Sequence, residues 1–370
     1  MFASISRWTR NGEYLGETSA KSTVLTRTQG LGNSPSSSNV QNGKAKPVEI
    51  KGRHDILSTV FLVDGEHVVS GGAEGLIRRW RGENGMDMGM PMDAGSPVGS
   101  IAVSQDGRWV VGGTESGVLT VWNAETHRRV TEFKGHSDWV RAVDVSPNAM
   151  EMATGSDDKT ACVWSFTTQV SFSIESTAEQ RVLGPLKHKS PVVAVKFSPD
   201  GRLIATATWL RTSIRVYHRQ DGRLLVDIPI QVSSCYNGSL AWAGDSRQLF
   251  ALSRDGNINC LDVSTGTTLS KWPIHNRNNP LCITLTSDSH IIAASADSSV
   301  SFWDTTTHKQ IGSVIEHTHA VWSMAISANY DLVVGGNTTI TIRGLSQMFP
   351  SPYFDAVSAT ASNPLHEMAS

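Results

Sequence analysis

The sequence has little of what marks a disulfide-stabilised, zinc-binding or membrane-spanning protein. Its 370 residues include four cysteines, and no two of them form a CxxC motif. Scattered cysteines of this kind argue against a zinc site or a disulfide framework and indicate a reducing compartment. No apolar run reaches about 18 residues, so no transmembrane helix is expected. Residues 1–10 lack the apolar stretch of a secretory signal.

An excess of charge of either sign is also missing. Lys and Arg number 32, and Asp and Glu number 34, which gives a net charge of −2 at pH 7. A surface that binds nucleic acid needs clustered positive charge, so no nucleic-acid partner is expected. Hydrophobic residues make up 39% of the chain and charged residues only 18%. This balance argues against wholesale disorder and against a protein with many membrane spans.

Tryptophan, by contrast, is abundant, and its spacing reveals an internal repeat. The chain has 11 Trp but only 5 Tyr. Trp80, Trp122 and Trp164 are spaced by 42 residues, and each closes a similar β-branched or apolar phrase. Turn-forming phrases such as Ser-Pro-Asp-Gly at 198–201 recur upstream of the closing residues. Seven such copies, each with four short strands, predict the blades of a β-propeller between residues 46 and 345.

At this point the repeats resemble those of the WD40 family. The best copy runs from Lys134-Gly135-His136 to Val163-Trp164, and Trp303-Asp304 is a literal Trp-Asp pair. The resemblance implies an all-β fold, a seven-bladed propeller of four-stranded antiparallel blades. In this family the start of the chain supplies the outer strand of the last blade. Residues 46–51 are therefore expected to pair with residues 338–343, and the C-terminal tail is the alternative donor.

The resemblance also implies a buried, hydrogen-bonded tetrad of His, Ser or Thr, Asp and Trp within a blade. Buried polar atoms need partners, and a fully paired network fixes strand geometry. The third repeat matches the tetrad in full, the first matches with Glu in place of Asp, and the fifth and sixth match in part. The residues concerned are His136, Thr154, Asp158 and Trp164 in the third repeat, His54, Ser70, Glu74 and Trp80 in the first, Asp255 in the fifth, and Asp297 and Trp303 in the sixth. The second, fourth and seventh repeats are more degraded.

Similar side chains form hydrolase triads, but a set that recurs from blade to blade favours a structural role. We therefore expect no catalytic residue, no metal site and no cofactor. An enzyme with a site in the central channel would need acidic or His residues on several inner strands. These strands are mostly apolar, and Asp144 and Lys196 are isolated charges on them.

Segments of different composition flank the repeats. Residues 1–45 are interpreted as a flexible N-terminal segment, because residues 18–45 are rich in Ser, Gly, Asn, Thr and Gln. Residues 1–17 resemble the closing half of another repeat. They are interpreted either as a relic of a longer array or as a strand packed outside the ring. Residues 346–370 are interpreted as a flexible C-terminal tail.

Partner binding by such a propeller is expected on one face, through its loops and strand entrances. The family's exposed positions are the third and fifth residues after the tetrad His and the residue before the tetrad Asp. Carried over repeat by repeat, they form a rim rich in Trp, Tyr and Arg, the residue types that dominate interface energetics. The rim residues are Trp139, Arg141, Asp157, Trp209, Arg211, Tyr236, Arg254, Asn279 and Trp322. The alternative is that Trp139 and Trp322 pack sideways onto neighbouring blades.

The leading hypothesis is a non-catalytic scaffold or adaptor that binds other proteins or peptides on this rim. Its three Arg favour an acidic or aromatic partner. No membrane contact is expected. The protein would be a monomer alone or a subunit of a complex, in the cytoplasm or also in the nucleus. The alternatives are a fragment of a larger multidomain signalling protein and a propeller enzyme with a channel site.

Overall fold

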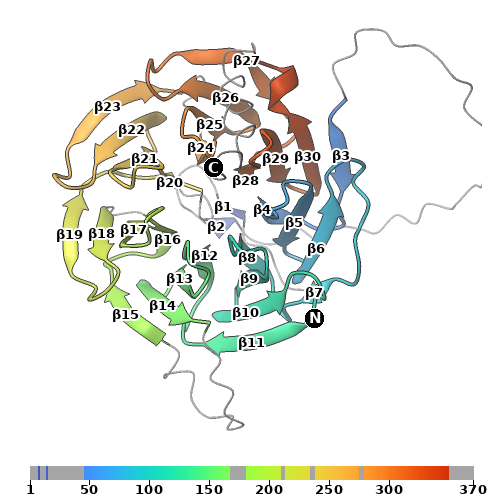
Figure 1. Cartoon of the computed structure of the whole chain (residues 1–370), viewed down its shortest axis with the longest axis horizontal. Helices are drawn as coiled ribbons and strands as arrows, with labels where there is room; N and C mark the ends of the chain where they lie inside the picture. Colours follow the sequence, from blue (N-terminus) through green and yellow to red (C-terminus); the bar gives the residue numbers. More distant parts are fainter. Residues whose placement is uncertain are drawn as a thin grey trace, which may run out of the picture. The chain divides into compact units, whose positions relative to one another are not determined.

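The computed structural model describes residues 7–8, 14–15, 46–166, 181–209, 213–233, 238–274 and 279–349. The chain divides into two units, Met1–Lys44 and Ala45–Ser370. In the first unit, β1 (Arg7–Trp8) pairs antiparallel with β2 (Tyr14–Leu15). The second unit holds seven four-stranded antiparallel sheets arranged in a ring, which are the blades of a β-propeller (Figure 1).

The blades follow the chain, and each begins with the strand nearest the centre of the ring (Figure 1). Blade 1 consists of β4 (Ile56–Phe61), β5 (His67–Gly72), β6 (Leu76–Arg81) and β7 (Met92–Asp93), and blade 2 consists of β8 (Val98–Val103), β9 (Trp109–Thr114), β10 (Val118–Asn123) and β11 (Arg129–Lys134). Blade 3 consists of β12 (Val140–Val145), β13 (Glu151–Ser156), β14 (Thr160–Ser165) and β15 (Arg181–Lys187), and blade 4 consists of β16 (Val192–Phe197), β17 (Leu203–Thr208), β18 (Ile214–His218) and β19 (Leu224–Ile228). Blade 5 consists of β20 (Leu240–Trp242), β21 (Gln248–Leu252), β22 (Asn257–Asp262) and β23 (Thr268–Pro273), and blade 6 consists of β24 (Pro280–Leu285), β25 (Ile291–Ala296), β26 (Ser299–Asp304) and β27 (Gln310–Glu316). Blade 7 consists of β28 (Ser323–Ile326), β29 (Asp331–Gly336), β30 (Thr339–Gly344) and β3 (Val48–Lys51).

Burial changes from the inside of a blade to its outside. Every residue of β25 is buried, whereas β23 exposes most of its residues and buries Trp272. The second strand of each blade is covered by a neighbouring blade on both faces, so the side chains on both faces must be small or apolar. Serines on the first strands join neighbouring blades, because Ser58 Oγ accepts the Ile101 N–H at 2.9 Å and Ser100 Oγ accepts the Val143 N–H at 3.1 Å. The apolar core is thus continuous across the seams between blades.

The ring is closed by the strand that precedes the first repeat. β3 pairs antiparallel with β30, with Val48 opposite Ile342 and Lys51 opposite Thr339. Blade 7 therefore takes its outermost strand from the N-terminal side of the propeller unit. Ile50, which is 5% exposed, packs in a cluster with residues of blades 1 and 7. This pairing covers the edge of β30, and β3 becomes the outer strand of blade 7.

The last described residues pack on the ring beyond β30. A short 3₁₀ helix, Leu345–Gln347, follows the strand, and Leu345 is fully buried. Phe349 is also buried, and its ring lies edge-on to Phe302 with the ring centroids 4.8 Å apart. Ordered packing therefore extends four residues past residue 345. Residues 350–370 lie outside the described residues.

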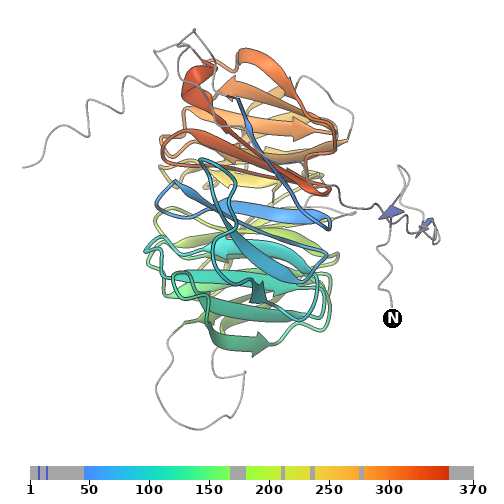
Figure 2. The same ribbon diagram turned by 90° about the vertical axis from the view of Figure 1, so that its right-hand side faces the viewer.

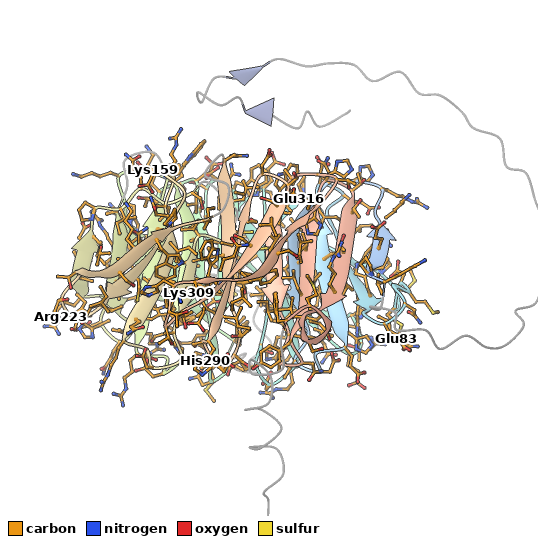
Figure 3. All side chains as sticks on the ribbon, turned by 90° about the horizontal axis from the view of Figure 1, so that it is seen from above. Glu83, Lys159, Arg223, His290, Lys309 and Glu316 are labelled. Carbon is orange, nitrogen blue, oxygen red and sulfur yellow. The ribbon has the colours of Figure 1, made fainter. Side chains whose placement is uncertain are left out.

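The blades present two faces, which the edge-on view of the ring shows on either side of the strands (Figure 2). We call the upper face the one formed by the turns between second and third strands, such as residues 157–159. The lower face is formed by the turns between first and second strands, such as residues 288–290. Lys159 and His290 accordingly lie on opposite faces (Figure 3). No helix within the described ranges is both long and apolar enough to cross a bilayer.

Candidate interaction face

The upper face of blade 3 carries a cluster of three rim residues, Trp139, Arg141 and Asp157. Arg141 Nε donates to both carboxylate oxygens of Asp157 at 3.0 Å, and Nη2 donates to Oδ2 at 2.7 Å. The Arg141 guanidinium also lies over the Trp139 ring, 4.0 Å from its centroid. Both charged side chains are less than one fifth exposed.

The cluster is held from two elements and from the neighbouring blade. Trp139 precedes β12, which carries Arg141, while Asp157 follows β13. The Asp157 N–H donates to the Trp139 carbonyl at 2.9 Å, which fixes the loop against the turn. The Trp139 indole lies against Gly99 of blade 2, where an added Cβ would lie 2.5 Å from Nε1. Bidentate pairing and ring stacking together give Arg141 one defined orientation.

The three described rim tryptophans occupy seams between blades. Trp139 touches blade 2, Trp209 packs on a cluster shared by blades 4 and 5, and Trp322 packs on a cluster shared by blades 6 and 7. All three are partly exposed. Trp139 and Trp322 therefore pack sideways onto neighbouring blades, as the alternative interpretation expected, and both remain partly exposed.

The remaining rim residues differ in what the structure says of them. Arg254 and Asn279 are exposed. The Arg254 N–H donates to the Gln231 carbonyl, as the Asp157 N–H donates to the Trp139 carbonyl in blade 3. Arg211 and Tyr236 lie outside the described residues. The described rim therefore has one well-defined cluster, two further tryptophans and two exposed polar side chains.

Beneath the cluster, blade 3 contains the full tetrad. Trp164 Nε1 donates to Thr154 Oγ1 at 2.8 Å, His136 Nε2 lies 2.8 Å from the same oxygen, and His136 Nδ1 lies 2.8 Å from Asp158 Oδ2. Burial by itself raises the pKa of Asp158, but hydrogen bonds from His136 and Thr160 outweigh it and lower the pKa to about 2. The carboxylate is therefore a firm acceptor at the end of a buried network.

Blade 4 contains a related network that the sequence analysis missed. His188 Nε2 lies 3.5 Å from both Thr206 Oγ1 and Tyr217 Oη, and the His188 and Tyr217 rings meet edge-on with centroids 6.0 Å apart. His188 stands 18 residues before Thr206, just as His136 stands 18 residues before Thr154. This 18-residue spacing between His and Thr was the feature of the sequence that could have identified the network in blade 4. It went unnoticed because Tyr replaces Trp and no Asp follows at the usual position.

In blade 1 the expected tetrad is wrong in two members. Trp80 Nε1 donates to Ser70 Oγ at 2.7 Å, but Glu74 contacts Arg78, and His54 is exposed. Counting 18 residues back from Ser70 leads to Gly52, which has no side chain to contribute. His54 stands two residues later in the loop, where it lines the same cavity as Ser70 and Glu74 but is exposed.

Asp297 in blade 6 and Asp255 in blade 5 also do not take the role that Asp158 has in the tetrad of blade 3. Asp297 lies in the tight turn between Ala296 and Ser299, with φ of 52°, and is exposed. The hairpin is one residue shorter than in blade 3, which leaves Asp297 at an exposed position where Asp158 is partly buried. Trp303 Nε1 donates instead to Ser301 on its own strand at 3.0 Å.

In blade 5, Asp255 is exposed and is bonded by Ser253 Oγ and by Lys271 Nζ. These bonds outweigh the effect of burial and lower the pKa of Asp255 to about 2. A Ser and a Lys thus hold this carboxylate where blade 3 uses a His.

Asp144 on β12 and Lys196 on β16 are joined to each other. Lys196 Nζ lies 3.3 Å from Asp144 Oδ1, and Asp144 Oδ2 accepts the Phe197 N–H at 2.8 Å. Burial raises the pKa of Asp144, while Lys196 opposes that effect. The pair links blades 3 and 4. Within the described ranges, no group of three His, Cys, Asp or Glu side chains is arranged to hold a metal ion.

Comparison with known proteins agrees with this architecture. The family model described as "WD domain, G-beta repeat" matches residues 93–123, 127–165, 180–218 and 266–304. Small ribosomal subunit protein RACK1y of Oryza sativa subsp. japonica is 28% identical over 139 residues, which are 36% of this chain and 38% of that protein. Target of rapamycin complex subunit wat1 of Schizosaccharomyces pombe is 24% identical over 250 residues, which are 64% of this chain and 74% of that protein.

Among solved structures, the WD40 β-propeller domain of Doa1 superposes with a TM-score of 0.67 at 19% sequence identity. The match covers 80% of this chain and 95% of the Doa1 chain, and at this identity it speaks for the fold alone. The chain spans well under half the length of the rice relative. Repeat matches in four places and a ring of seven four-stranded blades identify the chain as a WD40-repeat β-propeller.

Proposed function

We propose that the protein is a non-catalytic interaction scaffold whose partner docks on the upper face. The relatives support a scaffold role in general, because their names describe a ribosomal subunit protein and a subunit of the target of rapamycin complex. Propellers bind through loops held on a rigid ring. The ring described above provides such a support.

The observation that carries the proposal is the cluster of Trp139, Arg141 and Asp157. Trp and Arg are the residue types most enriched among binding hot spots. Here both are partly exposed and held in one orientation by stacking and by a bidentate ion pair. Binding to a preorganised surface costs less side-chain entropy than binding to a mobile one. The cluster is therefore suited to be the centre of an interface.

The charged rim residues indicate which kind of partner segment the upper face would bind. Asp157 already neutralises Arg141, so the described rim has less positive character than its sequence indicates. Arg254 is exposed and can pair with an acidic group. Trp139 is partly exposed and offers an apolar contact. We propose a partner segment that places an aromatic side chain against Trp139 and an acidic one near Arg254.

The test is affinity capture from native lysate, followed by measurement of the dissociation constant for each partner identified. The triple variant Trp139→Ala, Trp322→Ala and Arg254→Ala is compared with the wild type. A hot-spot truncation costs about 2 kcal/mol or more, which corresponds to about a 30-fold weaker dissociation constant. Captured partners should be lost from the triple variant.

The matched control is Arg223→Ala, an exposed arginine on the lower side of the ring (Figure 3). It removes the same kind of side chain as Arg254→Ala, and it should leave capture unchanged. Thermal melts verify that each variant is folded. If a folded triple variant keeps every partner, or if the control loses the same ones, the assignment to the upper face is wrong.

A further inference from the structure

Blade 1 lacks a side chain where blades 3 and 4 have a histidine. The histidine stands 18 residues before the central Thr in both of those blades, as His136 before Thr154 and His188 before Thr206. The same count back from Ser70 gives Gly52. Strand pairing supports this correspondence, because Thr59 lies opposite Ser70 as Val143 lies opposite Thr154. Blade 1 therefore keeps the surroundings of an imidazole but lacks the imidazole.

The place left empty is a cavity of about 230 Å³. It is lined by Ser70, Glu74, Arg78, Trp80 and Asp87, together with the loop at residues 51–56. The loop residues Lys51, Arg53 and His54 are exposed, so the cavity opens to the surface on the upper face. One water molecule takes up about 30 Å³ in the liquid, so the volume has room for a five-membered ring and several waters.

The polar groups of the cavity match those around His136. In blade 3, Thr154 accepts the Trp164 N–H, so its own proton is available to His136 Nε2, and Nδ1–H then donates to Asp158. In blade 1, Ser70 accepts the Trp80 N–H at 2.7 Å in the same way. The Ser70 hydroxyl proton can then point into the cavity, while the side chain is only 2% exposed.

A carboxylate stands on the other side. Glu74 occupies the position of Asp158, and in the described part of the chain it is bonded only by Arg78, over the long distances of 3.3 and 3.5 Å. Arg78 is closer to Asp87, at 3.0 Å. Glu74 therefore keeps acceptor capacity toward the cavity. A ring that accepts from Ser70 and donates to Glu74 satisfies both groups, as neutral imidazole does.

We propose that this cavity is a binding site for a neutral imidazole ring, brought by a histidine side chain of a partner or by a free imidazole compound. The ring accepts the Ser70 hydroxyl proton at one nitrogen and donates its N–H to Glu74 from the other. It lies edge-on to Trp80, as His136 lies to Trp164 with centroids 6.1 Å apart. This site is separate from the cluster at Trp139, and it does not depend on that proposal.

The test is titration of tag-free protein with imidazole at pH 8, where the ring is neutral, followed by thermal unfolding and calorimetry. A ligand that binds only the folded state raises the melting temperature in a saturable way. N-methylimidazole lacks the N–H and should bind at least tenfold more weakly. Capped histidine, N-acetylhistidine methylamide, distinguishes the sources, since it binds only if the opening admits a side chain on a peptide backbone.

Two substitutions at one position provide the matched pair. Gly52 does not have a left-handed φ, and a Cβ there would lie 3.3 Å from Ile56 Cδ1, so a side chain requires that the end of Ile56 shift by a few tenths of an ångström. Gly52→His should fill the cavity from within, raise the melting temperature and abolish the response to imidazole. Gly52→Ala adds only the Cβ and should keep the response. Glu74→Gln should weaken imidazole binding about tenfold, which tests the site even if Gly52→His does not fold.

The proposal is overturned if imidazole causes no saturable shift in the wild type. It is equally overturned if folded Gly52→His responds as the wild type does, or if N-methylimidazole binds as well as imidazole.

Discussion

At the scale of residues, one hydrogen-bonded network is kept, altered or lost from blade to blade. Blade 3 has the complete set, blade 4 replaces Trp with Tyr217, and blade 1 has Gly52 in place of the histidine. Residue types alone predicted the complete set, because all four members stood in the family's order. The tetrad in blade 1 was misjudged because a histidine stood two residues from the required place, and only strand register distinguishes the two.

Two partly buried histidines make stability depend on pH. Burial and the charge of Arg215 lower the pKa of His188 to about 4, and burial and Arg343 lower that of His317 to about 4. In the unfolded chain both titrate near 6.5. As the pH falls from 6.5 to 4, the unfolded state takes up protons that the folded state refuses, so the free energy of unfolding falls. Below about pH 4 both states are protonated, and these groups cause no further loss.

This expectation is tested with urea unfolding between pH 7 and pH 4, comparing wild type with His188→Gln. The variant loses one group that titrates differently in the two states, so its free energy of unfolding should fall less steeply between pH 6.5 and 4. Equal slopes for His188→Gln and wild type would contradict the assignment.

At the scale of elements, the seams between blades depend on close approach at small residues. Gly99 on β8 lets the Trp139 indole lie across the seam between blades 2 and 3, and Gly113 on β9 lies against Val140 and Val143 of blade 3. Such approaches involve strands more than 20 residues apart. The repeat pattern predicted which strands exist, but it left open whether Trp139 serves to bind a partner or packs sideways on a neighbouring blade. The structure shows the sideways packing, and Trp139 is also partly exposed.

Replacing Gly99 with Ala tests the seam. The new Cβ would lie 2.5 Å from Trp139 Nε1 and 3.0 Å from the Val140 carbonyl, so the indole must move. Overpacking of this kind costs about 1–3 kcal/mol. We expect a lower free energy of unfolding in urea and weaker binding of any partner that uses Trp139.

Gly244→Ala is the matched control, because its Cβ would meet only Ser289 Oγ at 3.5 Å, an ordinary contact. It should change stability by less than about 0.5 kcal/mol. If the two variants unfold alike, the seam at Gly99 is not tightly packed.

At the scale of the whole molecule, the fold depends on one strand that joins the start of the ring to its end. β3 supplies the fourth strand of blade 7, and its alternating pattern buries Ile50 while Glu49 and Lys51 are exposed. Ile50 packs with Ile56 and Phe61 of blade 1 and with Ile340 of blade 7. β3 covers the edge of β30, which would otherwise be open to pairing with another chain.

Truncation of Ile50 to Ala should weaken this closure. A buried Ile→Ala change costs about 2–5 kcal/mol. We expect a lower midpoint of urea unfolding and a greater tendency to associate, measured by size-exclusion chromatography near the midpoint. Glu49→Ala changes the exposed neighbour on the same strand and should leave both properties unchanged. An Ile50→Ala variant as stable as Glu49→Ala would show that the closing strand contributes little.

The sequence by itself determined the repeat frame and the all-β class, and its resemblance to the WD40 family implied the complete tetrad of blade 3. The frame and the class follow from turn residues, period-2 patterns and tryptophan spacing, which are local properties of the chain. Only the tertiary structure decided that Arg141 is neutralised by Asp157 and stacked on Trp139, that Asp297 lies exposed in a tight turn, and that Gly52 lines a cavity beside Glu74. Each of these depends on distances between groups on different strands, and a shift of one or two residues in register changes which groups meet.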